Sequence, residues 1–173
     1  MSKQKKINLR ALTAGAMMAA LSIILERLLP ITPPSNMMDI RISLSNVPII
    51  LAGILVSPLA GGLAGVVSDI VGCFISGYAP FPILTLAPLV MGVLPAIILR
   101  YGKKYPFFKV ALAITITHII SSVLITTYGL SVMRGVAFIP MLITRIASCG
   151  INLIIDVLLV YILLKTPIGK TTK

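Results

Sequence analysis

Six long apolar runs constrain the fold of this chain more than any other feature. A helix needs about 20 apolar residues to cross the roughly 30 Å hydrocarbon core of a bilayer. The 173 residues are 58% hydrophobic and only 11% charged, with a mean hydropathy of +1.08, so they lack the charge that covers a water-soluble domain. We therefore predict an all-α integral membrane protein. The predicted spans are residues 9–29, 42–56, 59–76, 83–99, 107–126 and 138–164.

The boundary between the second and third runs rests on Ser57 and Pro58 alone. Proline ends or kinks a helix, and the run through this point is too long for one crossing. A five-span alternative would place the two chain ends on opposite sides. We predict one domain, 1–173, with six transmembrane helices. The loops are short, and the longest are the outer stretches 30–39 and 127–137.

The basic residues predict the orientation, because cytoplasmic flanks carry the excess of lysine and arginine. Three basic clusters fall before the first span, between the fourth and fifth, and after the sixth. With six spans all three face the cytoplasm, so both termini are predicted to be cytoplasmic. The net charge of +11 then reflects topology and contact with anionic lipid, and requires no nucleic-acid partner. The basic start lacks a small-residue cleavage site, which favours a retained first helix over a signal peptide.

The other four basic residues fall at the outer ends or in the outer halves of the predicted spans, and all are arginines: Arg27, Arg41, Arg134 and Arg145. A guanidinium group binds two carboxylate oxygens and stacks on rings, which favours binding of an anion from outside. Pairing of Arg27 with Glu26 and of Arg41 with Asp39, or contact with lipid headgroups, are the alternatives.

Two of the four acidic residues, Asp69 and Asp156, lie inside predicted spans, where carboxylates are functional candidates. Gly61 and Gly65 precede Asp69 at steps of four, so one side of this helix suits close helix packing or a flat ligand. We favour ligand contact for Asp69.

The sixth span carries a polar stripe at helical spacing, which we expect to face protein rather than lipid. Its members are Arg145, Cys149, Asn152 and Asp156. A purely structural brace from Arg145 to Asp69 or Asp156 is the alternative to ligand binding.

Catalytic and metal-site motifs are not supported by the sequence. Residues 169–171 resemble the end of a phosphate-binding loop, but Leu164 replaces its leading glycine and no strand precedes it. His118 is the single histidine, and we expect it to hydrogen-bond between helices rather than bind a metal. Cys73 and Cys149 both lie inside spans, where a disulfide is not expected. We predict no enzyme, no cofactor and no metal.

The first span has two faces of small side chains. Ala11, Gly15 and Ala19 form one face, while Ala16 and Ala20 lie on the next. Small residues allow close approach of another helix. The second face favours docking to another subunit, and ordinary packing within the chain is the alternative.

Three segments resemble the substrate-binding S components of energy-coupling factor (ECF) vitamin transporters, and most closely their folate subgroup. They begin at Arg41-Ile-Ser-Leu-Ser-Asn-Val-Pro, at Gly65-Val-Val-Ser-Asp69 and at Tyr78-Ala-Pro-Phe-Pro. In the first helix, Ala16-Met-Met-Ala-Ala20 resembles the AxxxA docking motif, and Ile24-Leu-Glu-Arg27-Leu resembles the Leu-Ser-Arg stretch of the subgroup. The chain departs from the subgroup in reading Phe81-Pro-Ile-Leu-Thr-Leu-Ala for Phe-Pro-Gly-Phe-Thr-Leu-Ser. The resemblance extends from the first span through the fourth.

The resemblance implies a vitamin-binding subunit of a bacterial plasma-membrane importer. Such a subunit captures folate from outside, then docks through Ala16 and Ala20 on a coupling subunit that carries two ATPases. Asp69 would accept from the pterin edge, Arg27 would stack on or pair with the rings, and Arg41 and Arg145 would engage carboxylate. The residues implied to line the pocket from the third outer connection are Tyr78, Phe81 and Thr85.

Three other functions remain as alternatives. The chain could be an S component for riboflavin, pantothenate or a queuosine precursor. A proton-coupled exporter would use Asp69 or Asp156 as its relay and need no ATPase. A membrane enzyme is disfavoured, because four scattered acids lack metal-site spacing.

Overall fold

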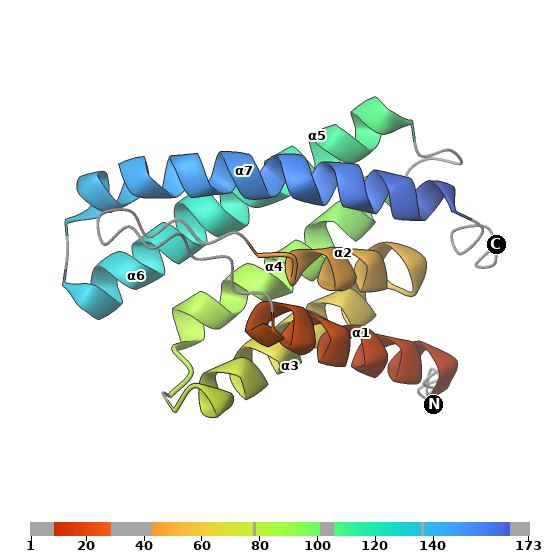
Figure 1. Cartoon of the computed structure of the whole chain (residues 1–173), viewed down its shortest axis with the longest axis horizontal. Coiled ribbons are helices and arrows are strands. Elements are labelled where there is room, and N and C mark those ends of the chain that lie inside the picture. Colours follow the sequence, from red (N-terminus) through yellow and green to blue (C-terminus); the bar gives the residue numbers. More distant parts are fainter. Residues whose placement is uncertain (1–8, 29–42, 78, 101–105, 136, 167–173) are drawn as a thin grey trace, which may run out of the picture.

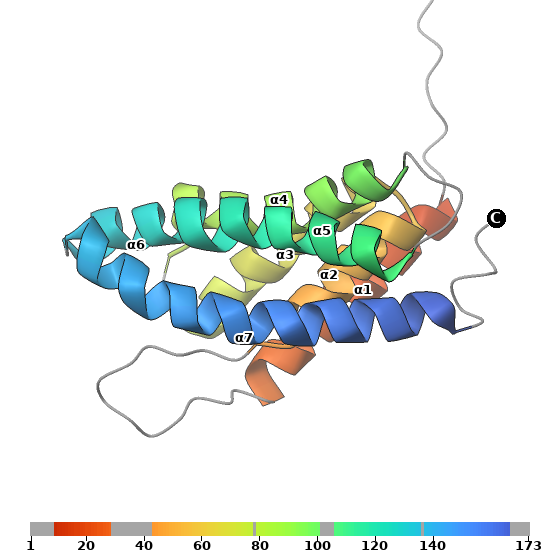
Figure 2. The same cartoon turned by 90° about the horizontal axis from the view of Figure 1, so that it is seen from above.

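Helices make up nearly all of the structure, a computed structural model that describes residues 9–28, 43–77, 79–100, 106–135 and 137–166, without the side chains of 9–12, 27, 28, 140, 144 and 147. The helices are α1 (Leu9–Leu28), α2 (Asn46–Leu55), α3 (Pro58–Ile75), α4 (Pro82–Arg100), α5 (Phe107–His118), η1 (Ile119–Thr126), α6 (Thr127–Arg134) and α7 (Phe138–Lys165). They run roughly along the long axis, with α2 and α4 between the α1/α3 pair and the α5/α7 pair (Figures 1 and 2).

Four helical stretches of the described chain are long and apolar enough to cross a membrane. They are Pro58–Ile75, Pro82–Arg100, Phe107–Arg134 and Met141–Lys165. Two further apolar stretches, Thr13–Glu26 and Asn46–Leu55, are shorter. At 1.5 Å per residue, the ten residues of α2 span about 15 Å, half of a hydrocarbon core. Helices therefore occupy all six predicted runs, although only four meet the length of a span.

The second and third runs separate where the sequence predicted. Ser57 caps α3, since its hydroxyl accepts from the Ala60 amide at 3.1 Å, and Pro58 is the first helical residue. The second helix, however, begins at Asn46 rather than near 42. Ser43 and Ser45 lie before the helix, and their hydroxyls bond each other at 2.7 Å, an alternative to helical hydrogen bonding.

The prediction of a loop over 127–137 was wrong for most of its length. The fifth helix continues through a π-helical segment, η1, into α6 and ends only at Gly135, which has a φ of 65°. This left-handed conformation favours glycine and terminates the helix. The hydroxyls of Thr126 and Thr127 donate to carbonyls five residues earlier, in keeping with the wider π turns.

Glycines bring α2, α3 and α4 into backbone contact. A Cβ atom on Gly61 would collide with Gly53 of α2 and with the Gly92 carbonyl of α4, and one on Gly65 would collide with the Pro88 carbonyl. The spacing of Gly61 and Gly65 suited either close helix packing or a flat ligand, and the structure shows close helix packing.

The two ends of the molecule differ in chemistry. A cluster of buried aliphatic side chains fills the end where α1 begins and α7 ends. Its centre includes Ile50, Leu99, Val110, Ile114 and Val160. The other half, where α3 ends and α4 begins, holds the buried polar groups described next (Figure 1).

Candidate functional site

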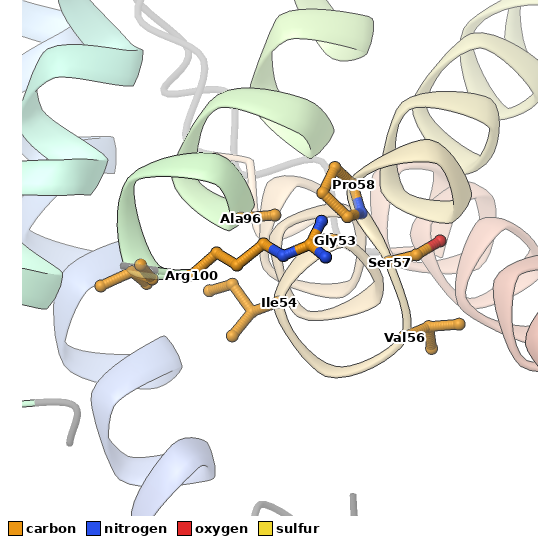
Figure 3. Close-up of a pocket in the computed structure, with 8 residues that line it drawn as sticks. Gly53, Ile54, Val56, Ser57, Pro58, Ala96 and Arg100 are labelled. Carbon is orange, nitrogen blue, oxygen red and sulfur yellow. The ribbon is translucent and has the colours of Figure 1, made fainter. Parts of the chain in front are cut away.

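Two cavities lie between the described helices. The smaller, about 340 Å³, lies at the corner between α2 and α3. All but two of its lining residues are apolar, and Arg100 reaches across it from the end of α4 toward Pro58 (Figure 3). With a single charged side chain and few polar ones, it offers little to orient a ligand.

The larger cavity, about 430 Å³, lies in the polar half of the molecule. Residues from α1, α2, α3, α4, α5, η1, α6 and α7 line it, together with Ser43, Ser45, Ala79 and Phe81. Small-molecule sites occupy roughly 300–1,000 Å³ and place polar groups so that they orient the ligand. More than half of the residues that line this cavity have polar side chains. This cavity is the candidate binding site.

Asp69 faces the cavity from α3 and is held by α4. The Thr85 hydroxyl donates to Asp69 Oδ2 at 2.7 Å, and the two side chains are half-buried. Thr85 thereby fixes one carboxylate oxygen and leaves the other available as an acceptor. Since ionised carboxylates accept strong hydrogen bonds, Asp69 suits a ligand with N–H donors.

Deeper in the bundle, Asp156 of α7 is fully buried and pairs with His118. His118 Nε2 lies 2.9 Å from Asp156 Oδ2, and Asn46 Nδ2 donates to the same oxygen at 3.2 Å. Cys149 Sγ lies 3.9 Å from the other ring nitrogen of His118. The expected helix-to-helix hydrogen bond of His118 is confirmed. The alternative of a brace from Arg145 to Asp156 is wrong, because His118 and Asn46 meet Oδ2 of this carboxylate and Oδ1 has no partner among the described residues.

The polar stripe of α7 faces protein, as predicted. Cys149 and Asp156 are buried, while Arg145 and Asn152 line the cavity. The Asn152 carbonyl accepts from the Ser43 amide at 2.8 Å, and its amide donates to the Ser148 carbonyl at 2.9 Å. Asn152 thus ties the segment before α2 to α7. Cys73 and Cys149 are not joined in a disulfide, as predicted.

The π-helical segment supplies part of the wall. Ser121, Ser122 and Thr126 line the cavity, and the Ser121 hydroxyl donates to the Ala87 carbonyl of α4 at 2.8 Å. A π-helix inserts an extra residue per turn and is frequent at functional sites. In this protein the π-helical segment places three polar side chains of an otherwise apolar helix at the cavity.

The structure brings some of the predicted site residues together and leaves others undescribed. Asp69, Phe81 and Arg145 line the cavity, and Thr85 contacts Asp69. Arg41, Tyr78 and the side chain of Arg27 lie outside the described part of the chain.

Arg134, one of the four outer arginines, also lines the cavity. Sequence reasoning missed several residues of the site: Ser22, Glu26, Asn46, Ser121 and Ser122. The available signal was a polar side chain within an apolar run, as at Ser22 and Glu26, which are four residues apart on α1. Among the described residues, no three His, Cys, Asp or Glu side chains gather as metal ligands.

The face of α1 that carries Ala16 and Ala20 points away from the bundle. Both side chains are exposed, whereas Gly15, Ala19 and Ser22 are buried. The other small face therefore packs inside the chain, and this one is left available.

The comparisons with known proteins agree with this architecture. The family model described as "ECF transporter, substrate-specific component" matches residues 10–164. The folate transporter FolT of Clostridium novyi (strain NT) is 30% identical over 158 residues, which cover 91% of this chain and 88% of that protein.

Two solved structures share the fold. The crystal structure of FolT bound with folic acid has a TM-score of 0.78 at 21% identity, covering 93% of this chain and 98% of the other. The S component for biotin from an ECF-type ABC transporter has a TM-score of 0.69 at 22% identity, covering 96% and 95%.

Proposed function

The chain belongs to the family of substrate-specific components of ECF transporters, and we propose that it captures folate from the extracellular side for import. The cavity lined by Asp69 is the observation that carries this proposal. Its carboxylate, held by Thr85, matches the donor edge of a pterin ring. The folate transporter that is 30% identical over most of the chain supports the same ligand.

The remaining polar groups suit the other parts of folate. Arg145 at the cavity wall would bind a glutamate carboxylate, aided by Arg41, while Arg27 would stack on or pair with the ring system. Phe81 and Tyr78 would supply aromatic faces to the rings. Thr85 would act through Asp69 rather than by direct contact.

In this proposal the chain is a single membrane domain of six helices that cross the cell membrane, with both termini cytoplasmic. The described start of α1, the end of α4, the start of α5 and the end of α7 lie at one end of the bundle (Figure 1). Arg100, Lys109 and Lys165 belong to that end. The excess of basic residues there favours a cytoplasmic location, so the cavity would face outward.

Transport would require partners. A coupling subunit of the membrane and two ATPase subunits would complete the importer, and the exposed face of Ala16 and Ala20 would dock on the coupling subunit. Substrate binding would need the chain alone, whereas uptake would need the assembly.

A calorimetric titration of the purified protein in detergent tests the proposal. The ligands are folic acid, a reduced folate, riboflavin, thiamine, biotin and pantothenate. We expect saturable one-to-one binding of a folate and no binding of the other four vitamins. Binding of a different vitamin alone would reject folate as the ligand while leaving the family role intact. Absence of binding to the whole panel would favour the proton-coupled exporter.

A further inference from the structure

The buried group Asp156 has no direct place in the proposed binding of folate, yet it touches two residues of the cavity wall. Both His118 and Asn46 line the cavity, and both meet Asp156 Oδ2. Asp156 itself does not line the cavity, and it contacts the cavity only through these two residues. Burying a carboxylate in a membrane bundle costs several kcal/mol unless it is compensated, so its retention calls for an explanation.

Stability alone does not account for this arrangement. Asp156 is fully buried, but its second oxygen, Oδ1, has no hydrogen-bond partner within the described part of the chain. A cluster selected only for stability would satisfy both oxygens or replace the pair with apolar side chains. Instead, the hydrogen bonds of Asp156 go to two side chains that line the cavity, His118 and Asn46.

Asp156 settles the orientation of the Asn46 amide. The NH₂ group of Asn46 donates to Asp156 Oδ2, which is the orientation that an ionised carboxylate requires, because it only accepts hydrogen bonds. The carbonyl oxygen of the same amide is then turned away from Asp156. Within the described chain the structure gives that oxygen no hydrogen-bond partner.

His118 keeps the carboxylate in place. Its Nε2 atom lies 2.9 Å from Asp156 Oδ2 and its Nδ1 atom 3.9 Å from Cys149 Sγ, so the ring is held from both sides. Asn152, the other asparagine of the cavity wall, differs from Asn46 because protein groups occupy both its amide nitrogen and its carbonyl. Asn46 is therefore the asparagine with an acceptor available to a ligand.

We infer that Asn46 is a ligand-recognising residue whose carbonyl accepts a hydrogen bond from an N–H group of the ligand, and that Asp156 is the positioning residue that fixes this orientation. The inference rests on the proposed function and deepens it. Asp69 and Asn46 would present acceptors from α3 and from the start of α2, so the ligand must carry N–H donors toward both. Pterins meet this requirement, and ligands with acceptors only do not.

A double-mutant cycle tests the inference by calorimetry with folic acid. We expect Asn46→Ala to weaken binding about tenfold and Asp156→Asn, whose amide no longer dictates the orientation of Asn46, to weaken it by a similar factor. Because Asp156 acts through Asn46, the double variant should bind about as weakly as either single variant, and not about 100-fold more weakly than the wild type.

Thr117→Val is the matched control. It removes a buried hydroxyl that bonds within α5, beside His118, and should leave affinity unchanged.

Unchanged affinity in Asn46→Ala would overturn the inference while leaving folate binding by the wild type established. Multiplicative losses in the double variant would reject the positioning role of Asp156. If Asp156→Asn does not yield folded protein, Asn46→Ala alone decides, since Asn46 is only half-buried at the first turn of α2. If the wild type binds no folate, the proposed function fails and the inference falls with it.

Discussion

At the scale of single residues, the bond from Thr85 to Asp69 gives a sharp prediction. Thr85→Val keeps the shape of the side chain but removes the hydroxyl that holds the carboxylate at 2.7 Å. We expect folate affinity to fall about 5- to 10-fold, because a typical hydrogen bond contributes about 0.5–1.5 kcal/mol. Thr115→Val is the control, since its hydroxyl bonds the Ala111 carbonyl within α5 and Thr115 does not line the cavity. Equal affinities of Thr85→Val and the wild type, measured by calorimetry, would remove Thr85 from the site.

Single residues were predictable from sequence where a polar group interrupts an apolar run. Asp69, Asp156 and the stripe of α7 were found in this way, because a charged group is costly in hydrocarbon. Their partners were not. His118 and Asp156 are 38 positions apart, and Asn46 and Asp156 are 110 apart, so their pairing depends on how the helices pack. No spacing rule within one helix could have indicated it.

At the scale of helices, composition located the apolar runs but not all of their ends. The start of α3 was found because Ser57 and Pro58 act locally as cap and first residue. The extension of the fifth helix through Arg134 was missed because Thr127, Tyr128 and Gly129 look like loop residues. Gly129 is buried within this helix, close to the side chains of Ile83 and Leu84. The π-helical segment has no established sequence signature of its own.

The contact of α2, α3 and α4 predicts which glycines cannot change. Gly61→Ala would force these backbones apart, and we expect a loss of about 1–3 kcal/mol or more in stability. Gly150→Ala is the matched control, because a Cβ atom there meets nothing within 4 Å. Thermal unfolding in detergent, monitored by size-exclusion chromatography, should show a lower midpoint for Gly61→Ala than for the wild type. The midpoint of Gly150→Ala should not fall below that of the wild type. Equal midpoints would show that the helices can separate at little cost.

At the scale of the whole molecule, packing and binding occupy different halves. Aliphatic side chains fill one half, where the helices hold one another without polar groups. The cavity, the Asp156 cluster and the π-helical segment share the other half. The aliphatic half and the glycine contacts thus hold the helices together, while the polar half contains the candidate binding site. It also leaves the outer face of α1 free of any role in the cavity.

That separation predicts that docking can be disrupted without loss of binding. Ala16→Leu places a large side chain on the exposed face of α1, where close approach of a partner helix needs a small one. We expect folate affinity to remain within about twofold of the wild type, since Ala16 is not part of the cavity wall, while co-purification with the coupling subunit and its ATPases is lost. Ile154→Phe is the control, since it also enlarges an exposed apolar side chain, but on α7. It should preserve both folate affinity and co-purification, because α1 and α7 lie on opposite sides of the bundle (Figure 1). Retained assembly in Ala16→Leu would place the docking surface elsewhere, and lost assembly in Ile154→Phe would extend it to α7.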